Sequence, residues 1–336
     1  LTTAQLNKIQ FTGYAAGATQ LASGEIVPRA PFFTITGSSL AHGTRCVGTA
    51  ATTITYTITN TGANAAGVTV TSNNAEFVVS NLSSTTINNG ATATYDVTFT
   101  PSASGARTAD ITIDTTTLNG NTPVTSTVTG TGNALPQGSL TANGAFCASG
   151  AGQLTWTASA GTGNYTVIYN DGTANRTASS VVSGTAFNTF TTPVTSTTTY
   201  TLVSVTDANT CARTTSFTGS SATITVNTST TSIAPGTTQN IPVSTNRTTL
   251  TVTEGTSTFS SRIWKYGTSS GTYPTSTGVT GTSYTPNFGS TGTYFVVCET
   301  TYGSPCSTTV TSNEVQINVT SNTITTGTVS GSPFCA

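Results

Sequence analysis

The chain has 336 residues, of which only 6% are charged, and its formal net charge at pH 7 is −1. Such a small charge gives no electrostatic footprint for nucleic acid or for an anionic membrane surface, so we expect neither partner. Apolar residues make up 35% of the chain and include 13 Phe, 11 Tyr and 2 Trp. This supply excludes a disordered threonine-rich stalk and suits about three domains of roughly 100 residues.

Threonine accounts for about a quarter of the sequence. Its β-branched side chain favours the pleated backbone over the helix, and no segment of a dozen residues shows a helical period. We therefore expect an all-β fold. The sequence has no apolar stretch long enough to span a membrane, no Met and no signal peptide at its start, so we interpret it as a processed secreted product or a fragment of one.

Residues 1–29 precede the first recognisable domain and include an alternating run from Ile9 to Tyr14. In this run Ile9 and Phe11 occupy one face of a short predicted strand. The strand is expected either to join the first domain or to complete the sheet of a neighbouring molecule by strand addition.

The first predicted domain covers residues 30–133. Residues 50–60 alternate strictly, with Ile54, Tyr56 and Ile58 on one face, and the same period of two returns at 95–99 and 111–113. Strands at this spacing with turn residues between them predict a sandwich of antiparallel sheets. Residues 134–136 are the expected linker.

Two further β-sandwich domains are predicted at 138–227 and 228–320. Their strand candidates are 154–157, 165–169, 200–205, 250–252, 262–266, 293–298 and 315–319. Residues 327–336 resemble 138–148, because both segments lead to Phe-Cys-Ala, so residues 321–336 are expected to open a further repeat that this chain truncates. Tandem sandwiches with short linkers predict a rod.

Several runs carry a family resemblance. Tyr-Thr-Ile-Thr-Asn-Thr-Gly at 56–62, the run at 87–101 and Thr-Gly-Thr-Gly at 129–132 resemble the choice-of-anchor D repeat, which is related to the ASH/HYDIN immunoglobulin-like group. The runs at 197–211, 263–266, 284–286, 292–298 and 311–315 resemble immunoglobulin-like repeats of secreted Bacteroidota surface proteins.

The resemblance implies tandem immunoglobulin-like sandwiches at the cell surface, exported by the type IX system. The function expected from it is a segment of an extracellular filament or large adhesin, with copies of itself or further repeats as partners. The alternative is a non-catalytic string of carbohydrate-binding modules from a secreted enzyme, with surface glycans as ligands. Two or three coplanar exposed Tyr or Trp would favour that alternative.

Six cysteines are present, and module boundaries limit their pairing. Cys147 and Cys211 fall in one domain and are predicted to bond to each other. Cys298 and Cys306 flank a turn-rich run and are predicted to staple a hairpin. Cys46 and Cys335 are left over. Cys46 is either a buried thiol or an inter-chain crosslink, for instance to Cys335 of the next molecule.

Catalytic chemistry is nearly absent from the sequence, so we expect no enzyme, no cofactor and no metal site. The single histidine, His42, lies in a loop-like setting and is interpreted as solvated, and the carboxylates are scattered. Asp207 is expected to cap its own turn, and Trp156 and Trp264 to lie in cores. Asp114-Thr115-Thr116 resembles a Bacteroidota surface O-glycosylation pattern, with Thr115 as the acceptor.

Overall fold

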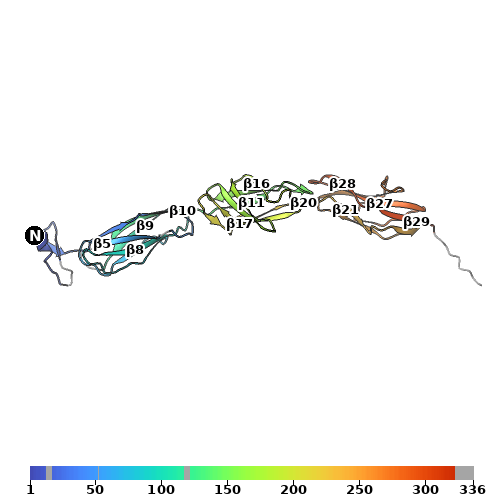
Figure 1. The fold of residues 1–336 in the computed structure, drawn as a ribbon. Coiled ribbons are helices and arrows are strands. Elements are labelled where there is room, and N and C mark those ends of the chain that lie inside the picture. The colour runs from blue at the N-terminus through green and yellow to red at the C-terminus, as the bar shows by residue number, and fades with distance from the viewer. Residues whose placement is uncertain (13–16, 52, 117–121, 322–336) are drawn as a thin grey trace, which may run out of the picture.

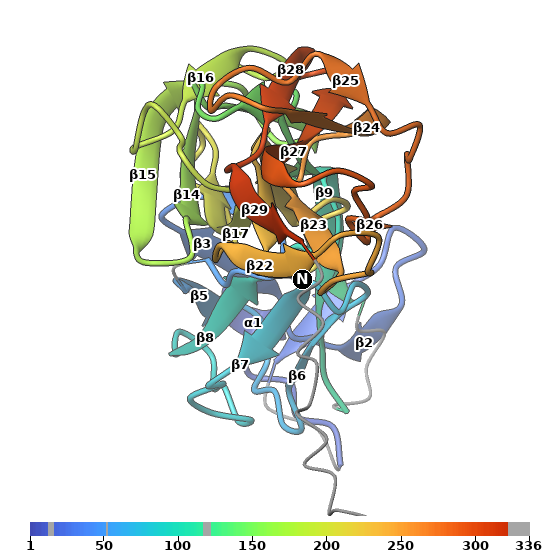
Figure 2. The same ribbon diagram turned by 90° about the vertical axis from the view of Figure 1, so that its right-hand side faces the viewer.

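The computed structural model of the chain describes residues 1–12, 17–51, 53–116 and 122–321. These residues form three β-sandwiches in a row, with the N-terminal segment at one end (Figure 1). Seen along the row, the second and third sandwiches overlap in projection and the first lies partly below them, so the row is slightly bent (Figure 2). The prediction of an all-β, tandem immunoglobulin-like fold is confirmed.

The N-terminal segment differs from its prediction. Its first element is α1 (Thr3–Leu6), which begins with a capping box between Thr2 and Gln5. Ile9 and Phe11 lie in no strand, and β1 (Ala18–Gln20) pairs with β2 (Ile26–Pro28) in a sheet of two. The described part of this segment therefore adds no strand to the first sandwich, and Tyr14 lies outside the described residues. With four residues, α1 is also far too short to cross a membrane.

The first sandwich packs two four-stranded sheets. One has the order β3-β5-β8-β7 and the other β4-β10-β9-β6. Tyr56 and Ile58 of β5 face the core together with Val97 and Phe99 of β8, because alternate residues of a strand point to the same side. The strand bounds are β3 Phe33–Gly37, β4 Ala41–Cys46, β5 Ile54–Asn60, β6 Thr69–Ser72, β7 Phe77–Ser80, β8 Thr92–Phe99, β9 Gly105–Asp114 and β10 Val124–Asn133.

The second sandwich is built around Trp156 and Leu154, both fully buried. A three-stranded sheet β11-β13-β16 faces a sheet of order β15-β14-β17-β18, to which β19 adds through β17, while β12 pairs with β20. The bounds are β11 Gln137–Ala142, β12 Phe146–Cys147, β13 Gln153–Ala160, β14 Tyr165–Asn170, β15 Asn175–Val181, β16 Ala186–Asn188, β17 Thr198–Thr206, β18 Ala212–Arg213, β19 Ser221–Ile224 and β20 Val226–Asn227.

The third sandwich repeats this plan around Trp264. Its sheets have the orders β21-β23-β26 and β22-β29-β27-β24-β25, with β28 paired to β27. The bounds are β21 Thr231–Ala234, β22 Gln239–Pro242, β23 Leu250–Glu254, β24 Phe259–Gly267, β25 Thr275–Ser276, β26 Ser283–Tyr284, β27 Gly292–Tyr302, β28 Thr308–Thr311 and β29 Val315–Thr320. Both tryptophans are completely buried, as expected from the sequence.

All three sandwiches share one feature at the end from which the chain leaves. An early strand runs parallel to the last strand, and the two finish side by side. Cys46 is in register with Asn133 in the first sandwich, and Cys147 with Asn227 in the second. In the third sandwich the corresponding pair is Pro242 and Thr320.

Candidate functional site

Two disulfides join neighbouring sandwiches. Cys46 of the first sandwich is bonded to Cys211 of the second, and Cys147 of the second is bonded to Cys306 of the third. The Cα atoms of the two pairs are 5.5 and 5.1 Å apart, within the usual range for disulfides. These crosslinked junctions are the candidate functional site of the molecule, because they fix how one sandwich follows the next.

Each junction is built in the same way. The preceding sandwich supplies the cysteine at the end of its early parallel strand, β4 or β12. The following sandwich supplies the cysteine from the turn after its long central strand, β17 or β27. The two bonded pairs are separated by 165 and 159 residues, a nearly equal distance in sequence that reflects the repeated plan.

The turn that carries Cys211 is organised by Asp207. Its Oδ1 accepts hydrogen bonds from the backbone amides of Asn209 and Cys211 at 3.0 and 2.9 Å, and its Oδ2 accepts from the amide of Thr162 at 3.0 Å. This confirms that Asp207 caps its own turn. Asp207 is buried, and its hydrogen bonds hold the backbone of Cys211 in position for the bond to the first sandwich.

The turn that carries Cys306 is held differently. The backbone amide of Cys306 donates to the carbonyl of Gly303 at 3.1 Å, which closes a tight turn between β27 and β28. The hydroxyl of Ser229, in the linker from the second sandwich, donates to the carbonyl of Cys306 at 3.4 Å. Both linker and turn therefore contribute to the same contact.

The linkers themselves are short and packed. Between β10 and β11 the carbonyl of Pro136 accepts a hydrogen bond from Arg213 Nε at 2.6 Å. Between β20 and β21 the Tyr302 hydroxyl donates to the carbonyl of Thr230, and the Thr228 carbonyl accepts from the amide of Ser257 at 3.0 Å. Three residues lie between the strands at each junction, and their hydrogen bonds add to the contact that the disulfide makes between the sandwiches.

The predicted pairing of Cys147 with Cys211 is wrong. These cysteines lie at opposite ends of the second sandwich, since Cys211 reaches the first sandwich and Cys147 the third. The prediction that Cys46 is a free thiol or an inter-chain crosslink to Cys335 is also wrong, because Cys46 is bonded to Cys211. Cys335 lies outside the described residues.

The predicted pairing of Cys298 with Cys306 is wrong as well. Cys298 stands opposite Trp264 in the β24–β27 register, is fully buried in the third core and has no disulfide partner. Cys306 lies in the turn beyond the end of that strand and faces the second sandwich. Burial raises the pKa of the Cys298 thiol to about 11, so it stays protonated at neutral pH.

His42 is not a solvated loop residue, contrary to the sequence interpretation. It lies in β4, is 4% exposed, and contacts Phe77 edge-on with ring centroids 5.5 Å apart. The Tyr56 hydroxyl donates to the carbonyl of Ser39 at 2.8 Å and lies 3.2 Å from His42 Nε2. Since that hydroxyl has one proton, Nε2 is the donor to it, and Nδ1 is buried without a partner in the described structure.

This setting buries His42 among aromatic rings. Desolvation lowers its pKa, so the imidazole is neutral at physiological pH. The hydroxyl within hydrogen-bond reach of His42 is that of Tyr56, which donates its own proton to the carbonyl of Ser39. Within the described ranges there is also no group of three metal-ligating side chains.

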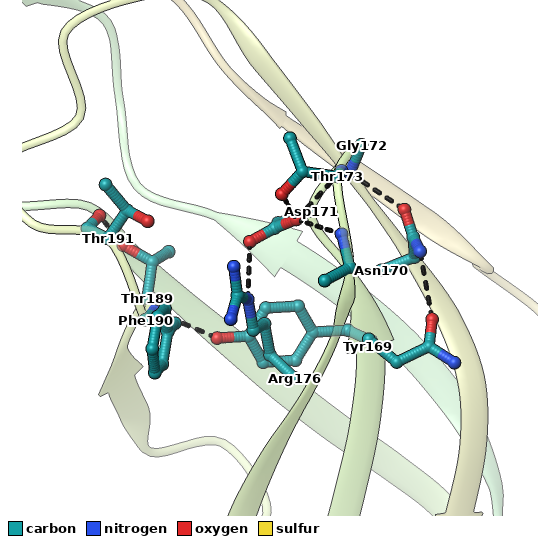
Figure 3. A network of polar contacts seen from close by, with 11 residues as sticks. Tyr169, Asn170, Asp171, Gly172, Thr173, Arg176, Thr189, Phe190 and Thr191 are labelled. Carbon is teal, nitrogen blue, oxygen red and sulfur yellow. Dashed lines mark hydrogen bonds and ion pairs between the residues drawn. The ribbon is translucent and has the colours of Figure 1, made fainter.

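A polar network on the second sandwich holds the β14–β15 hairpin (Figure 3). Asp171 accepts hydrogen bonds from the amides of Thr173 and Ala174, and its Oδ2 forms an ion pair with Arg176 Nε at 2.7 Å. These bonds lower the pKa of Asp171, with the Thr173 hydroxyl as the largest contribution. A carboxylate held ionised in this way is a structural anchor and not a general acid.

The exposed aromatic side chains are few and dispersed. Phe190 is 68% exposed and lies under the Arg176 guanidinium, whose carbon is 3.9 Å from the ring centroid. Phe32 and Phe259 lie on the other two sandwiches. Both tryptophans are buried, and no tyrosine in the described part of the chain is classed as exposed. The described surface therefore has no tyrosine or tryptophan platform of the kind that would favour carbohydrate binding.

Two other predicted sites stay predictions. Thr115 follows the end of β9, is half-buried and donates its hydroxyl proton to the carbonyl of Ala66 at 2.6 Å. Ile9 accepts a hydrogen bond at its carbonyl from the amide of Gly17 at 2.9 Å. Neither contact tests O-glycosylation at Thr115 or strand addition through Ile9 and Phe11.

A family model matches part of the first sandwich. The HYDIN/CFA65/VesB-like, Ig-like domain model covers residues 43–131, which agrees with the resemblance of this module to the HYDIN group. Among curated proteins, no sequence matches the chain.

Solved structures with several tandem domains are similar to the chain at low identity. Domains of titin are 12% identical, with 86% of this chain and 99% of that chain covered and a TM-score of 0.25. The FN1–FN3 domains of chicken CNTN1 are 13% identical, with 86% and 98% covered and a TM-score of 0.27. The ICAM-5 D1–D4 ectodomain fragment is 8% identical, with 85% and 77% covered and a TM-score of 0.31. The family match is confined to residues 43–131 of the first sandwich, and the tandem β-sandwiches are a property of the topology described above.

Proposed function

We propose that this chain is a structural segment of an extracellular filament or of a large cell-surface adhesin. The observation that carries the proposal is the pair of disulfides between sandwiches, Cys46–Cys211 and Cys147–Cys306. Disulfides inside a sandwich stabilise one domain, whereas these bonds fix the relation of one domain to the next. Such crosslinks suit a structural protein in which successive domains must keep a fixed distance and orientation.

The same bonds support an extracellular location. Disulfides persist in oxidising environments and are rare where thiols are kept reduced. The sparse charges support packing in a filament. A surface of threonine hydroxyls with a net charge of −1 causes little electrostatic repulsion between neighbouring rods. The resemblance of the modules to Bacteroidota surface repeats makes the cell surface of such a bacterium the place that we propose, with export by the type IX system.

The partners that we propose are further repeats of the same polypeptide and other copies of the chain. Surface glycans are a weaker candidate, since both tryptophans are buried. The exposed Phe190 is stacked with Arg176, which leaves one face of its ring for a contact with another molecule.

The test is immunogold electron microscopy of cells that produce the protein, with antibodies against this chain. Label along surface fibres is the expected result, and it should be lost from fibres of cells in which the gene is deleted. Label confined to the cell interior, or only on a soluble secreted complex, would overturn the proposal. Binding of the purified chain to an array of surface polysaccharides would instead favour the carbohydrate-binding alternative.

A further inference from the structure

We infer that the two crosslinks make the rod a redundant tether, whose two ends stay covalently joined when the backbone is cut in any one, or any two, of three segments. The bonds Cys46–Cys211 and Cys147–Cys306 define two crosslinked points. Because the bonded cysteines alternate along the chain, the segments 46–147, 147–211 and 211–306 each run from one point to the other. These segments are therefore three parallel connections between the same two points.

The overlap of the two disulfide loops is what creates the parallel connections. If Cys147 were bonded to Cys211 and Cys298 to Cys306, the two loops would follow one another, and one cut between 46 and 147 would divide the chain. In the observed pairing, the loop closed by Cys46 and Cys211 contains Cys147, and the loop closed by Cys147 and Cys306 contains Cys211. No single cut between 46 and 306 can then separate the ends.

Each connection passes through a different sandwich. Strands β5 to β10 of the first sandwich lie in 46–147, β13 to β17 of the second in 147–211, and β21 to β27 of the third in 211–306. Proteases cut folded domains preferentially at exposed loop tips. A cut in a loop of one sandwich leaves the other two connections whole, so damage to one domain does not divide the rod.

A short crossing of the middle sandwich also limits how far the two crosslinked points can move apart. Asn133 lies beside Cys46 in the first sandwich, and only the 14 residues from 133 to 147 lead from there to Cys147. A stretched residue spans about 3.3–3.6 Å, so this crossing reaches about 46–50 Å. A middle sandwich that is cut in one of its own loops therefore cannot be drawn out far beyond that length while the first sandwich stays folded.

Cleavage at one chosen site in each connection tests the tether. The enterokinase recognition sequence, Asp-Asp-Asp-Asp-Lys, does not occur in the chain and can be inserted after residue 88, 172 or 289. These positions lie in exposed loops between β7 and β8, β14 and β15, and β26 and β27. A different peptide tag at each end of the full chain allows both ends to be followed on denaturing gels that are run without reductant.

After complete cleavage at one site or at two, both tags should remain in a single band of full mass, which reduction splits into the expected fragments. After cleavage at all three sites, two products should form, residues 1–88 linked to 173–289 and residues 89–172 linked to 290–336. Separation of the tags after the single cut at 88 would overturn the inference, and so would tags that stay joined after all three cuts.

Serine variants assign the effect to each bond. With Cys147→Ser and Cys306→Ser, the cut after 289 alone should separate the tags, because 88 and 172 lie within the remaining loop. With Cys46→Ser and Cys211→Ser, the cut after 88 alone should separate them, because 172 and 289 lie within the other loop. The matched control is Cys298→Ala, which removes a cysteine that forms no disulfide and should behave as the wild type does.

The chain without insertions provides an independent measurement. Trypsin cuts after Lys and Arg, and its sites include Arg107, Arg176 and Lys265, one in each connection. After alkylation of free thiols, complete digestion of the denatured, unreduced chain should leave residues 46–107 linked to 177–213 and residues 108–176 linked to 266–336. A linked pair of 108–176 with 177–213 would overturn the inference. The proposed surface location would stand in that case, since the microscopy of producing cells tests it separately.

Discussion

In the first and second sandwiches a cysteine stands beside the asparagine that ends the last strand, whereas in the third sandwich Pro242 stands beside Thr320. One backbone hydrogen bond recurs at all three places. The amides of Val47, Ala148 and Val243 donate to the carbonyls of Asn133, Asn227 and Thr320 at 2.9, 2.8 and 2.9 Å. The parallel strand pair is thus common to all three sandwiches. The disulfide is present only where the last residue of the early strand is a cysteine.

The covalent rigidity between neighbouring sandwiches depends on the cysteine at each ending. The first two endings lock the next sandwich covalently, and the third ending has no cysteine to do so. Because the same backbone hydrogen bond closes each ending, exchanging side chains at these positions should change the coupling between sandwiches more than it changes the sandwiches.

The largest effect is expected from replacing Cys46, Cys147, Cys211 and Cys306 by serine. On the loop-entropy model each bond stabilises the folded chain by about 5 kcal/mol relative to the fully unfolded chain. We expect lower thermal stability and a broader distribution of distances between spin labels on the first and third sandwiches. Cys298→Ala is the control, and a distance distribution as narrow as that of the wild type in the serine variant would contradict the comparison.

A smaller effect is expected from Asp207→Ala, which breaks the turn that presents Cys211. Three backbone amides lose a charged acceptor, so we expect the second sandwich to lose about 3 kcal/mol. The yield of the Cys46–Cys211 bond on oxidative refolding should also fall, as measured by mass mapping. Asp171→Ala is the matched control, because it removes a similar set of hydrogen bonds on a hairpin away from the bonded cysteines. Equal bond yields in the two variants would disprove the role of Asp207.

A pH effect is expected from His42, which shares β4 with Cys46. Burial lowers its pKa in the folded state, so the unfolded state binds the proton more tightly. The free energy of unfolding of the first sandwich is therefore highest above pH 6.5 and falls below it, by at most about 1.4 kcal/mol per pH unit for one proton. Hydrogen exchange of the β5 amides reports this stability, and His42→Gln should flatten the decline between pH 6.5 and 5. If the free energy of unfolding of His42→Gln falls as steeply with decreasing pH as that of the wild type, groups other than His42 cause the decline.

The smallest effect on stability is expected from Pro242→Cys, which gives the third ending the residue of the other two. Pro242 is half-buried at the end of β22, so we expect a change of less than about 1 kcal/mol. The new thiol should react with maleimide in the native chain, whereas Cys46 and Cys147 should not react until they are reduced. Mass mapping compares the labelling of the cysteine at position 242 with that of Cys46 and Cys147. A thiol at 242 that does not react in the folded chain would show that the third ending differs from the other two in more than its side chain.

The strands and cores could be predicted from the sequence because their signal is local. Ile54, Tyr56 and Ile58 alternate with threonines, and the structure places all three against the first core. Trp156 and Trp264 are the largest side chains of their strands, and the structure buries both in the cores. Asp207 could be assigned to its turn for the same reason, since two of the three amides that it binds, those of Asn209 and Cys211, lie two and four positions away.

The disulfides could not be predicted in this way because their signal is not local. Pairing cysteines within one module assumes that they are close in space, but Cys147 and Cys211 occupy the two ends of a sandwich. The available signal was the recurring separation of 165 and 159 residues, which relates a strand end to a turn in the next module. His42 was missed because its apolar neighbours Phe77 and Phe99 come from other strands.

The buried thiol of Cys298 constrains the order in which the protein folds and forms its disulfides. Only eight residues separate it from Cys306, and in an unfolded chain such a short loop closes more readily than one of 159 residues. Packing of the third core hides the Cys298 sulfur beside Trp264 and keeps it protonated, which removes the nearer competitor. Correct oxidation therefore has to follow domain folding, and an export route that oxidised thiols before the cores closed would trap the wrong isomer.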